Sequence, residues 1–324
     1  MIPYGRQSID KDDIEAVEEI LKSDWLTQGP TVENFEEEVC GYTGAHYGVA
    51  VNSATSALHI ACIALDLGPG DVVWTSPNTF VASANCALYC GAEIDFVDIC
   101  PDTFNMSCVA LRDKLILAKK LGKLPKIVIP VHFGGQSCEM EEFKELAKEY
   151  KFKIIEDASH ALGAEYNGKL VGDCEHCDVT IFSFHPVKMI TTGEGGMALT
   201  KSKSLYKKML TARSHGIVRD PEIFSQVNDG EIWGFQQQDL GYNYRMSDIH
   251  AALGISQLKK LKSFIRRRTE IAHAYDNAFI GSSVVPQLSS RNVDSSYHLF
   301  VVRLKLSQSN ITQKEVFEAL RKKD

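Results

Sequence analysis

The 324-residue sequence lacks several features that would assign a protein to a class at once. It has no apolar run long enough to span a membrane, and its opening MIPYGRQSIDKDD turns acidic without the apolar core of a signal peptide. It has no basic excess, because 35 Lys and Arg stand against 42 Asp and Glu, a net charge of −7. We therefore expect a cytoplasmic protein without a membrane or nucleic-acid partner.

Two common binding motifs are also missing. Cys174 and Cys177 form one C-x-x-C pair, but a zinc knuckle needs a second pair, and the other cysteines do not provide one. No Gly-x-x-x-x-Gly-Lys motif of a nucleotide-binding P-loop is present. We expect no bound metal, and we expect the nine cysteines to be reduced thiols.

Short apolar runs alternate with helical patterns through most of the chain. They lie at residues 47–51, 71–76, 93–99, 126–133, 151–158 and 178–184. This alternation predicts βα units and an α/β fold with a mostly parallel sheet flanked by helices. Because sites in such sheets form beyond the carboxyl ends of the strands, the segments that follow these runs are the candidates for chemistry.

The C-terminal part of the sequence has a different pattern. We predict a large domain over residues 1–246 and a bridging helix with a small α+β domain over residues 247–324. That small domain shows one strand pattern, SSYHLFVVRL, and one helix pattern, TQKEVFEALRKKD. Because a lone strand has no hydrogen-bonded neighbour, we expect the small domain to be incomplete within this sequence.

Three segments after predicted strands suggest a binding site, although each also has a plain structural explanation. NSATSALH opens a helix with small residues, so free backbone N–H groups near Thr55 and Ser56 are suited to a phosphate, or simply to a helix cap. Asp157 ends a strand, where it is suited to a protonated ring nitrogen or to a turn. Phe80 is suited to stacking on a planar ring or to the core.

Lys188, in FSFHPVKMITTGEGG, gives these segments a common interpretation. A lysine in a desolvated cleft loses part of its proton affinity and can form a Schiff base with a carbonyl, whereas a surface lysine would do neither. A lysine, a strand-end carboxylate, an aromatic ring and a phosphate cradle together predict pyridoxal phosphate as the cofactor.

The motifs NSATSALH, EDASHALGAEYNGKLVG, FSFHPVKMITTGEGG and GYNYRMSDIHAALGISQL, in this order, resemble the DegT/DnrJ/EryC1/StrS family of sugar aminotransferases. The resemblance runs from the N-terminus to about residue 304. It implies the aspartate-aminotransferase-like fold, that is, fold type I of the pyridoxal-phosphate enzymes, with a seven-stranded sheet. It also implies a homodimer whose two active sites share residues.

The resemblance assigns roles to individual residues. Lys188 matches the catalytic Schiff-base lysine, Asp157 the partner of the pyridine nitrogen, and His160 a residue lying against the ring. The remaining cofactor positions that match are Ala54, Thr55, Phe80, Ser183 and Asn243, the last of which reaches the neighbouring subunit. The substrate contacts that match are Tyr4, Asp24, Trp25, Leu26, Thr27, Ala54 and Ser183. Arg213, His215, Arg219 and Arg245 are further candidates for an anion clamp.

The resemblance also implies the reaction. We expect an amino group to move from L-glutamate to C4 of a UDP-linked 4-keto-6-deoxy-N-acetylhexosamine. Another keto sugar nucleotide, of the perosamine or dTDP-sugar type, is the alternative substrate. The alternative that is not an enzyme is a catalytically silent regulatory or assembly protein. The sequence has a suitable residue at every position where the family motif carries the chemistry, and this argues against a silent protein.

Overall fold

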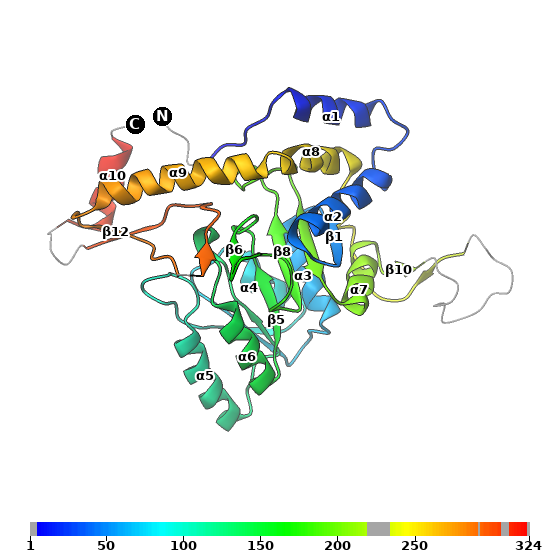
Figure 1. Ribbon diagram of the computed structural model, residues 1–324. Coiled ribbons are helices and arrows are strands. Elements are labelled where there is room, and N and C mark those ends of the chain that lie inside the picture. Colours follow the sequence, from blue (N-terminus) through cyan, green and yellow to red (C-terminus); the bar gives the residue numbers. More distant parts are fainter. Residues whose placement is uncertain (1–4, 219–233, 291, 306–310, 323–324) are drawn as a thin grey trace.

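The structure is a computed structural model that describes residues 5–218, 234–290, 292–305 and 311–322. A seven-stranded sheet lies at its centre, in the order β1-β9-β8-β5-β4-β2-β3 (Figure 1). The strands are β1 (Tyr47–Val51), β2 (Val72–Thr75), β3 (Glu93–Phe96), β4 (Ile127–Ile129), β5 (Lys153–Asp157), β8 (Val179–Ser183) and β9 (Gly196–Thr200). β9 runs antiparallel to both of its neighbours, β1 and β8, and the other neighbouring strands of this sheet pair in parallel. The predicted mostly parallel seven-stranded sheet is confirmed.

Helices cover both faces of the sheet because alternate strand residues point to opposite sides. In β5, Ile155 packs into the core that also includes residues of α3 (Ala54–Ala64), α4 (Ala82–Tyr89) and α7 (Lys203–Arg213). Its neighbour Ile154 points to the other face, where α5 (Cys108–Leu121) and α6 (Met140–Tyr150) lie. Near β1 and β9 that second face is covered by α2 (Pro30–Thr43) and α8 (Asp248–Leu258).

The first helix, α1 (Lys11–Leu21), is fastened to α8 by a buried carboxylate. Ser256 Oγ and Gln257 Nε2 each donate a hydrogen bond of 2.7 Å to Asp13, and Lys260 forms an ion pair with it at 2.5 Å. Asp10 is the N-cap of the same helix, and its side chain accepts a hydrogen bond from the N–H of Asp13. The N-terminal segment is therefore held beside the start of α9 (Leu261–Phe279).

The remaining elements are short. They are η1 (Phe133–Gly135), β6 (Glu165–Tyr166), β7 (Lys169–Leu170), β10 (Ile217–Val218), β11 (Gln236–Gln237), β12 (Val284–Pro286), β13 (Val293–Asp294), β14 (Val302–Leu304) and α10 (Gln313–Arg321). β13 joins β6 and β7 in a small three-stranded sheet, so a strand of the C-terminal region is hydrogen-bonded to a hairpin that lies between β5 and β8 in the sequence.

Two expectations for the C-terminal region are wrong. The segment 295–304 is not one lone strand: only β14 is extended, and it pairs antiparallel with β12, whose β-branched Val284 and Val285 precede Pro286. The stretch that begins at 247 is not one helix either, because α8 ends at Leu258 and α9 begins at Leu261. Lys260 marks the break, with its side chain turned to the acidic start of α1.

The predicted division into residues 1–246 and 247–324 stays a prediction. α9 passes over one end of the sheet, and α10 and β12 lie beyond it (Figure 1). Among the residues that the structure describes, no helix combines the length and the apolar character needed to cross a membrane.

Candidate active site

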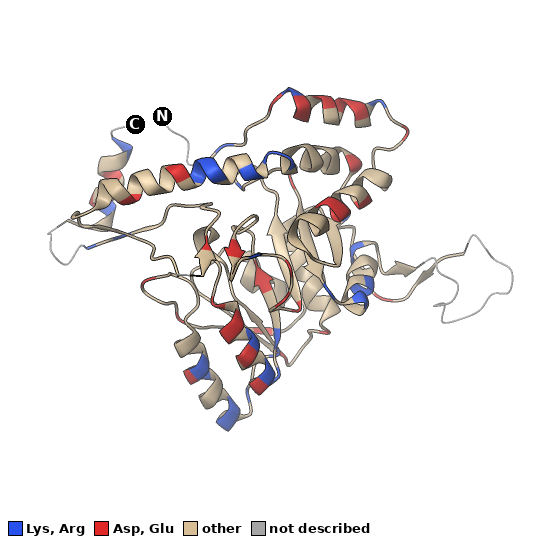
Figure 2. Cartoon of the chain, in the orientation of Figure 1, with Lys and Arg blue, Asp and Glu red and all other residues tan. Residues whose placement is uncertain are grey.

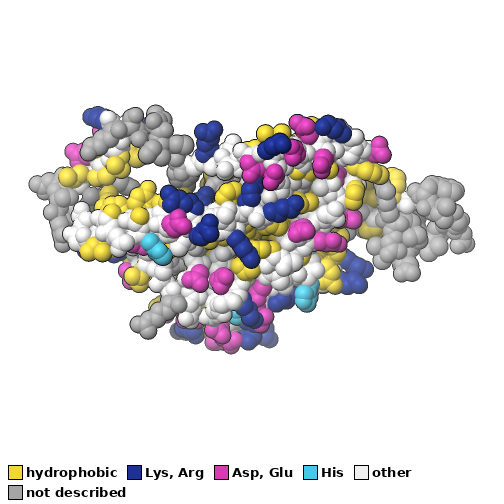
Figure 3. Space-filling model, turned by 45° about the horizontal axis from the view of Figure 1, so that its top comes forward, with side chains coloured by type: hydrophobic (Ala, Val, Ile, Leu, Met, Phe, Trp, Pro, Cys, Tyr) yellow, Lys and Arg dark blue, Asp and Glu magenta, His cyan; other side chains and the backbone are white. Residues whose placement is uncertain are grey.

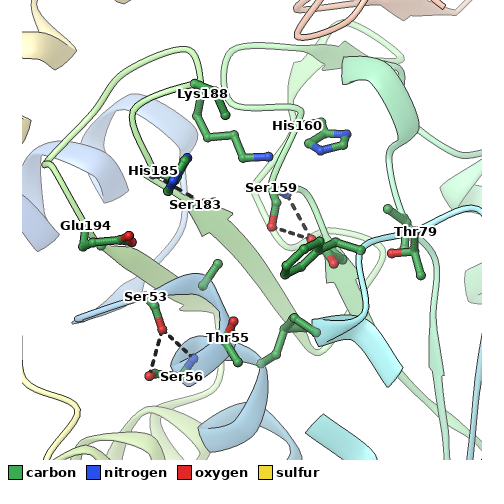
Figure 4. A pocket seen from close by; sticks show the side chains of 18 of the residues that line it. Ser53, Thr55, Ser56, Thr79, Ser159, His160, Ser183, His185, Lys188 and Glu194 are labelled. Atoms are coloured by element: carbon green, nitrogen blue, oxygen red, sulfur yellow. Dashed lines mark hydrogen bonds between the residues drawn. The ribbon is translucent and has the colours of Figure 1, made fainter. Parts of the chain in front are cut away.

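A cavity of about 670 Å³ lies at the carboxyl ends of the parallel strands. Figure 4 shows Lys188 on one side of it, with its amino group toward His160, and the start of α3 on the opposite side. The predicted site residues that line it are Ala54, Thr55, Phe80, Asp157, His160, Ser183 and Lys188. The structure therefore brings together seven predicted residues from four separate segments of the sequence.

The start of α3 is a ready cradle for an anion. Ser53 is the N-cap, and its hydroxyl accepts a hydrogen bond of 3.1 Å from the N–H of Ser56. The N–H groups of the first helical residues, Ala54 and Thr55, remain at the cavity wall, where the helix dipole adds partial positive charge. β9 packs directly behind this turn: a Cβ on Gly196 would lie 2.4 Å from the nitrogen of Ala54, so only glycine fits.

Asp157 is a buried carboxylate with its hydrogen bonds already made. It is the last residue of β5 and is 5% exposed. Ser83 Oγ donates a hydrogen bond of 2.6 Å to one carboxylate oxygen, and Ser159 donates to the other from its hydroxyl at 2.6 Å and its N–H at 3.1 Å. These donors fix the orientation of the carboxylate in the cavity wall.

Lys188 is half-buried in the loop between β8 and β9. Burial lowers the pKa of Lys188 to about 8, although the charge of Asp157 opposes the shift. Because the uncharged amine is the nucleophilic form, this lysine is far better suited to attack a carbonyl near neutral pH than an exposed lysine is.

His160 lies between the cavity and the C-terminal region. Its Nδ1 accepts a hydrogen bond of 3.3 Å from the N–H of Gly134, so the neutral ring carries its proton on Nε2. Burial lowers the pKa of His160 to about 4, helped by the charge of Lys188. Its ring packs on His298 with 4.4 Å between ring centroids, and Ser296 Oγ donates to its carbonyl oxygen at 2.8 Å.

Several predicted residues do not line this cavity. The run Asp24–Thr27 is exposed; Leu26 accepts a hydrogen bond of 3.0 Å from the N–H of Asp248, and Thr27 forms a β-bridge with Ser247. Asn243 is also exposed and lies elsewhere. The roles of these residues stay predictions. Tyr4 and Arg219 lie outside the described residues.

Among the other candidate clamps, Arg213 has a structural role. It forms an ion pair of 2.7 Å with Glu36 and donates a hydrogen bond of 2.9 Å to the carbonyl oxygen of Ala50. The remaining two, His215 and Arg245, are not among the residues that line the cavity.

Sequence reasoning missed three contributors to the site. Ser83 and Ser159 hold Asp157, and His298 backs His160. Ser159 follows a strand-end carboxylate by two residues, a spacing typical of a side chain that caps a turn, so it could have been found. Ser83 and His298 carry no such signal, because they reach the site from other elements.

These residues fit pyridoxal phosphate. The first turn of α3 would hold the phosphate, Asp157 would face the ring nitrogen, and Lys188 would bind the carbonyl carbon. The backbone contact of Gly196 with Ala54 keeps the cradle free of side chains from β9. Within the described parts of the chain, no group of three or more His, Cys, Asp or Glu side chains is placed to hold a metal ion.

Comparison with known proteins gives a consistent result. The model of the DegT/DnrJ/EryC1/StrS aminotransferase family matches residues 7–324. The UDP-4-amino-4,6-dideoxy-N-acetyl-β-L-altrosamine transaminase of Campylobacter jejuni subsp. jejuni serotype O:23/36 is 42% identical over 321 residues, which cover 99% of this chain and 81% of that protein.

Solved structures are similar over nearly the whole chain. Helicobacter pylori PseC, an aminotransferase involved in the biosynthesis of pseudoaminic acid, is 32% identical with a TM-score of 0.87, covering 99% of this chain and 82% of that one. The PLP form of the putative sugar aminotransferase Spr1654 from Streptococcus pneumoniae is 31% identical with a TM-score of 0.84, covering 98% and 82%. The predicted family, fold type I architecture and pyridoxal-phosphate cofactor are confirmed.

Proposed function

Because this chain belongs to the DegT/DnrJ/EryC1/StrS aminotransferase family, we propose that it aminates a nucleotide sugar on the pathway to pseudaminic acid. The amino group comes from L-glutamate. The acceptor is C4 of a UDP-linked 4-keto-6-deoxy-N-acetylhexosamine, and the product is UDP-4-amino-4,6-dideoxy-N-acetyl-β-L-altrosamine. One observation carries the proposal: Lys188, Asp157 and the first turn of α3 line one cavity at the carboxyl edge of the sheet.

Each of these groups has a distinct task. Pyridoxal phosphate, when bound, stabilises the negative charge that develops on a substrate carbon as it loses its proton. The Asp157 carboxylate, held by Ser83 and Ser159, stabilises positive charge on the ring nitrogen. The N–H groups at the start of α3 bind the phosphate and so fix the position of the ring.

Lys188 moves the protons. With its pKa lowered to about 8 by burial, its Nζ can take a proton from the α-carbon of the amino donor and release it again near neutral pH. The same atom returns a proton to C4 of the sugar in the second half of the reaction. His160 stays neutral because its pKa is lowered to about 4, so it packs against the ring without competing for the proton.

The proposal is tested by incubating the protein with L-glutamate and a panel of keto sugar nucleotides. The products are identified by mass and by NMR of the sugar ring. We expect amination at C4 of the UDP-linked 4-keto-6-deoxy-N-acetylhexosamine. Preferred amination at C3, or of a perosamine-type or dTDP-linked sugar, would replace the proposed substrate with the alternative one.

A catalytically silent protein would behave differently. The visible absorbance of the bound cofactor should bleach when L-glutamate is added and return when 2-oxoglutarate is added. A yellow protein whose spectrum L-glutamate leaves unchanged would favour a regulatory or assembly role. Lys188, Asp157 and the first turn of α3 all line the cavity, which supports the enzyme.

We also propose a homodimer in which each site borrows Asn243 from the other subunit. Asn243 is exposed and does not line the cavity of its own chain, and Phe80, which lines the cavity, and Val81 are 72% and 61% exposed. Mixing Lys188→Ala chains with Asn243→Ala chains should restore part of the activity, because one hybrid site then has both residues. No recovery after proven subunit exchange would contradict sharing.

The cytoplasm is the proposed location. All nine cysteines are free thiols, including the buried Cys62, Cys86 and Cys138. Free thiols are typical of a reducing compartment.

A further inference from the structure

A second cavity of about 260 Å³ lies on the other side of the Lys188 loop. Its walls come from the N-terminal segment, the loop that carries Lys188, and α9, and Lys188 lines both this cavity and the larger one. Three arginines face it, namely Arg6, Arg267 and Arg268. In Figure 2 the blue parts of the ribbon mark Lys and Arg positions in the first half of α9, and in Figure 3 basic side chains gather around the middle of the face shown.

Arg268 is a half-buried cation, and no carboxylate among the described residues pairs with it. Its NH1 donates to the carbonyl oxygens of Tyr297 and His298 at 3.1 and 3.3 Å. Burial lowers the pKa of Arg268, and within the described residues no acidic side chain opposes this shift. A buried cation normally has an anionic partner, because two carbonyl oxygens do not replace the lost hydration of a full charge.

The acidic groups nearby are already engaged. Glu270 pairs with Arg267 at 2.8 Å, but both side chains are largely exposed, so this pair is readily exchanged for a stronger partner. Asp13 is bound by Lys260 at 2.5 Å and by two hydrogen-bond donors. Arg6 is exposed, and Gln257, which also lines the cavity, donates to Ser8 and to Asp13.

We propose that this arginine-lined cavity binds the negatively charged end of the substrate while its reacting carbon lies at Lys188. The inference rests on the proposed function, which supplies two ligands of this chemistry. One is the side-chain carboxylate of L-glutamate, and the other is the diphosphate of the nucleotide sugar. Arginine suits both, because its planar group donates paired hydrogen bonds to carboxylate and phosphate oxygens.

Binding is measured on the cofactor-loaded protein with two probes, glutarate for the carboxylate and inorganic pyrophosphate for the diphosphate. Titration calorimetry needs no turnover, so its result is independent of whether the sugar is aminated. Arg6→Gln and Arg267→Gln are the cleanest variants, because both side chains are exposed. Each should weaken one probe about tenfold, the usual effect of losing a hydrogen bond to a charged group.

Arg268→Gln should weaken the same probe at least as much, and Arg268→Lys should retain part of the binding because it keeps the charge. Arg266→Gln is the matched control, since Arg266 is an exposed neighbour on α9 that does not line the cavity. It should change binding less than twofold. If Arg268→Gln fails to fold, the two variants at exposed arginines still decide the question.

Steady-state kinetics identify the source of the anion. A raised KM for L-glutamate alone assigns the cavity to the amino donor, and a raised KM for the nucleotide sugar alone assigns it to the diphosphate. Wild-type binding of both probes by Arg6→Gln and Arg267→Gln overturns the proposal. So does an equal loss in Arg266→Gln, which would indicate general charge attraction rather than a cavity.

Discussion

The two sides of Lys188 differ in how completely the chain satisfies its own polar groups. On the sheet side, Asp157 receives three hydrogen bonds from Ser83 and Ser159. On the α9 side, Arg268 donates to two carbonyl oxygens, and within the described residues no carboxylate pairs with it.

The wall on the sheet side is therefore preorganised by the chain itself, whereas the wall on the α9 side is suited to binding a ligand. A buried cation normally has an anionic partner, so a half-buried arginine without one beside a cavity indicates a partner that the chain itself does not supply. The sheet side needs no ligand to fix the direction of its carboxylate. On the α9 side, an anion would supply the negative charge that Arg268 lacks. Variants on the sheet side should therefore affect catalysis most, and those on the other side should affect binding and stability.

The largest effect is expected for Lys188→Ala, which should abolish turnover. No other amine lines the larger cavity within the described residues, so no group remains to move the proton. Lys208→Ala is the control, because Lys208 pairs with Asp66 on the surface. Borohydride treatment of the wild type should leave the cofactor mass on the peptide that contains Lys188. A label on another lysine would contradict the assignment.

Asp157→Asn should lower the rate on the order of 10²-fold or more. The amide keeps the shape of the side chain but cannot stabilise positive charge on the ring nitrogen. The matched control is Asp173→Asn, because Asp173 is a turn aspartate that accepts a hydrogen bond of 2.9 Å from the N–H of Glu175. The rate is measured in single turnover with L-glutamate. Equal, small effects in both variants would make Asp157 a turn residue too.

The contrast between the two sides also explains what could be predicted from the sequence. Asp157, Thr55 and Lys188 directly follow strand patterns, and strands of one parallel sheet end at one edge, so local patterns place them together. Six strands were recognised from apolar runs. The seventh strand, β9, begins at Gly196 and directly follows a glycine cluster that is typical of a loop. Its apolar run therefore gives no clear strand signal, and only the family resemblance implies a seventh strand.

The α9 side could not be predicted in this way. The arginines of KSFIRRRTE have the pattern of a solvated helix face, and only packing shows that Arg268 turns inward, toward the carbonyl of His298. That carbonyl lies in an irregular segment after Tyr297, whose φ of 48° is rare for a residue other than glycine. The pairing of β12 with β14 is missed for a similar reason, because three-residue strands carry almost no periodic signal.

A third variant tests how tightly the irregular segment is held. Gly135 has a φ of +104°, and a Cβ there would lie 2.7 Å from Ser296 Oγ and 2.9 Å from the nitrogen of His298. Gly135→Ala should therefore lower the free energy of unfolding by about 2–3 kcal/mol or more and weaken cofactor binding. Gly168→Ala is the control, because its φ is +72° but no atom lies within 4 Å of the new Cβ. Urea unfolding measures the change in stability, and cofactor titration measures the change in affinity. Equal losses in Gly135→Ala and Gly168→Ala would show that close contact with residues 296–298 is not what excludes a side chain at Gly135.

The smallest effect is expected for His298→Phe, and it concerns pH. Burial, together with the positive charges of Lys188 and Arg268, lowers the pKa of His298 to about 2, below the usual value of about 6.5. As the pH falls below 6.5, the unfolded chain takes up a proton at this residue while the folded chain does not. Folding is therefore destabilised by up to about 1.4 kcal/mol per pH unit from this imidazole.

His298→Phe removes that proton uptake and also the unpaired Nδ1, while it retains a ring that packs on His160. The free energy of unfolding between pH 6.5 and 5 should fall less steeply in the variant than in the wild type. His273→Phe, at an exposed position on α9, should leave the slope unchanged. Parallel curves for the wild type and His298→Phe would mean that His298 is protonated in the folded protein. A counter-ion or a bound anion would then have to reach it.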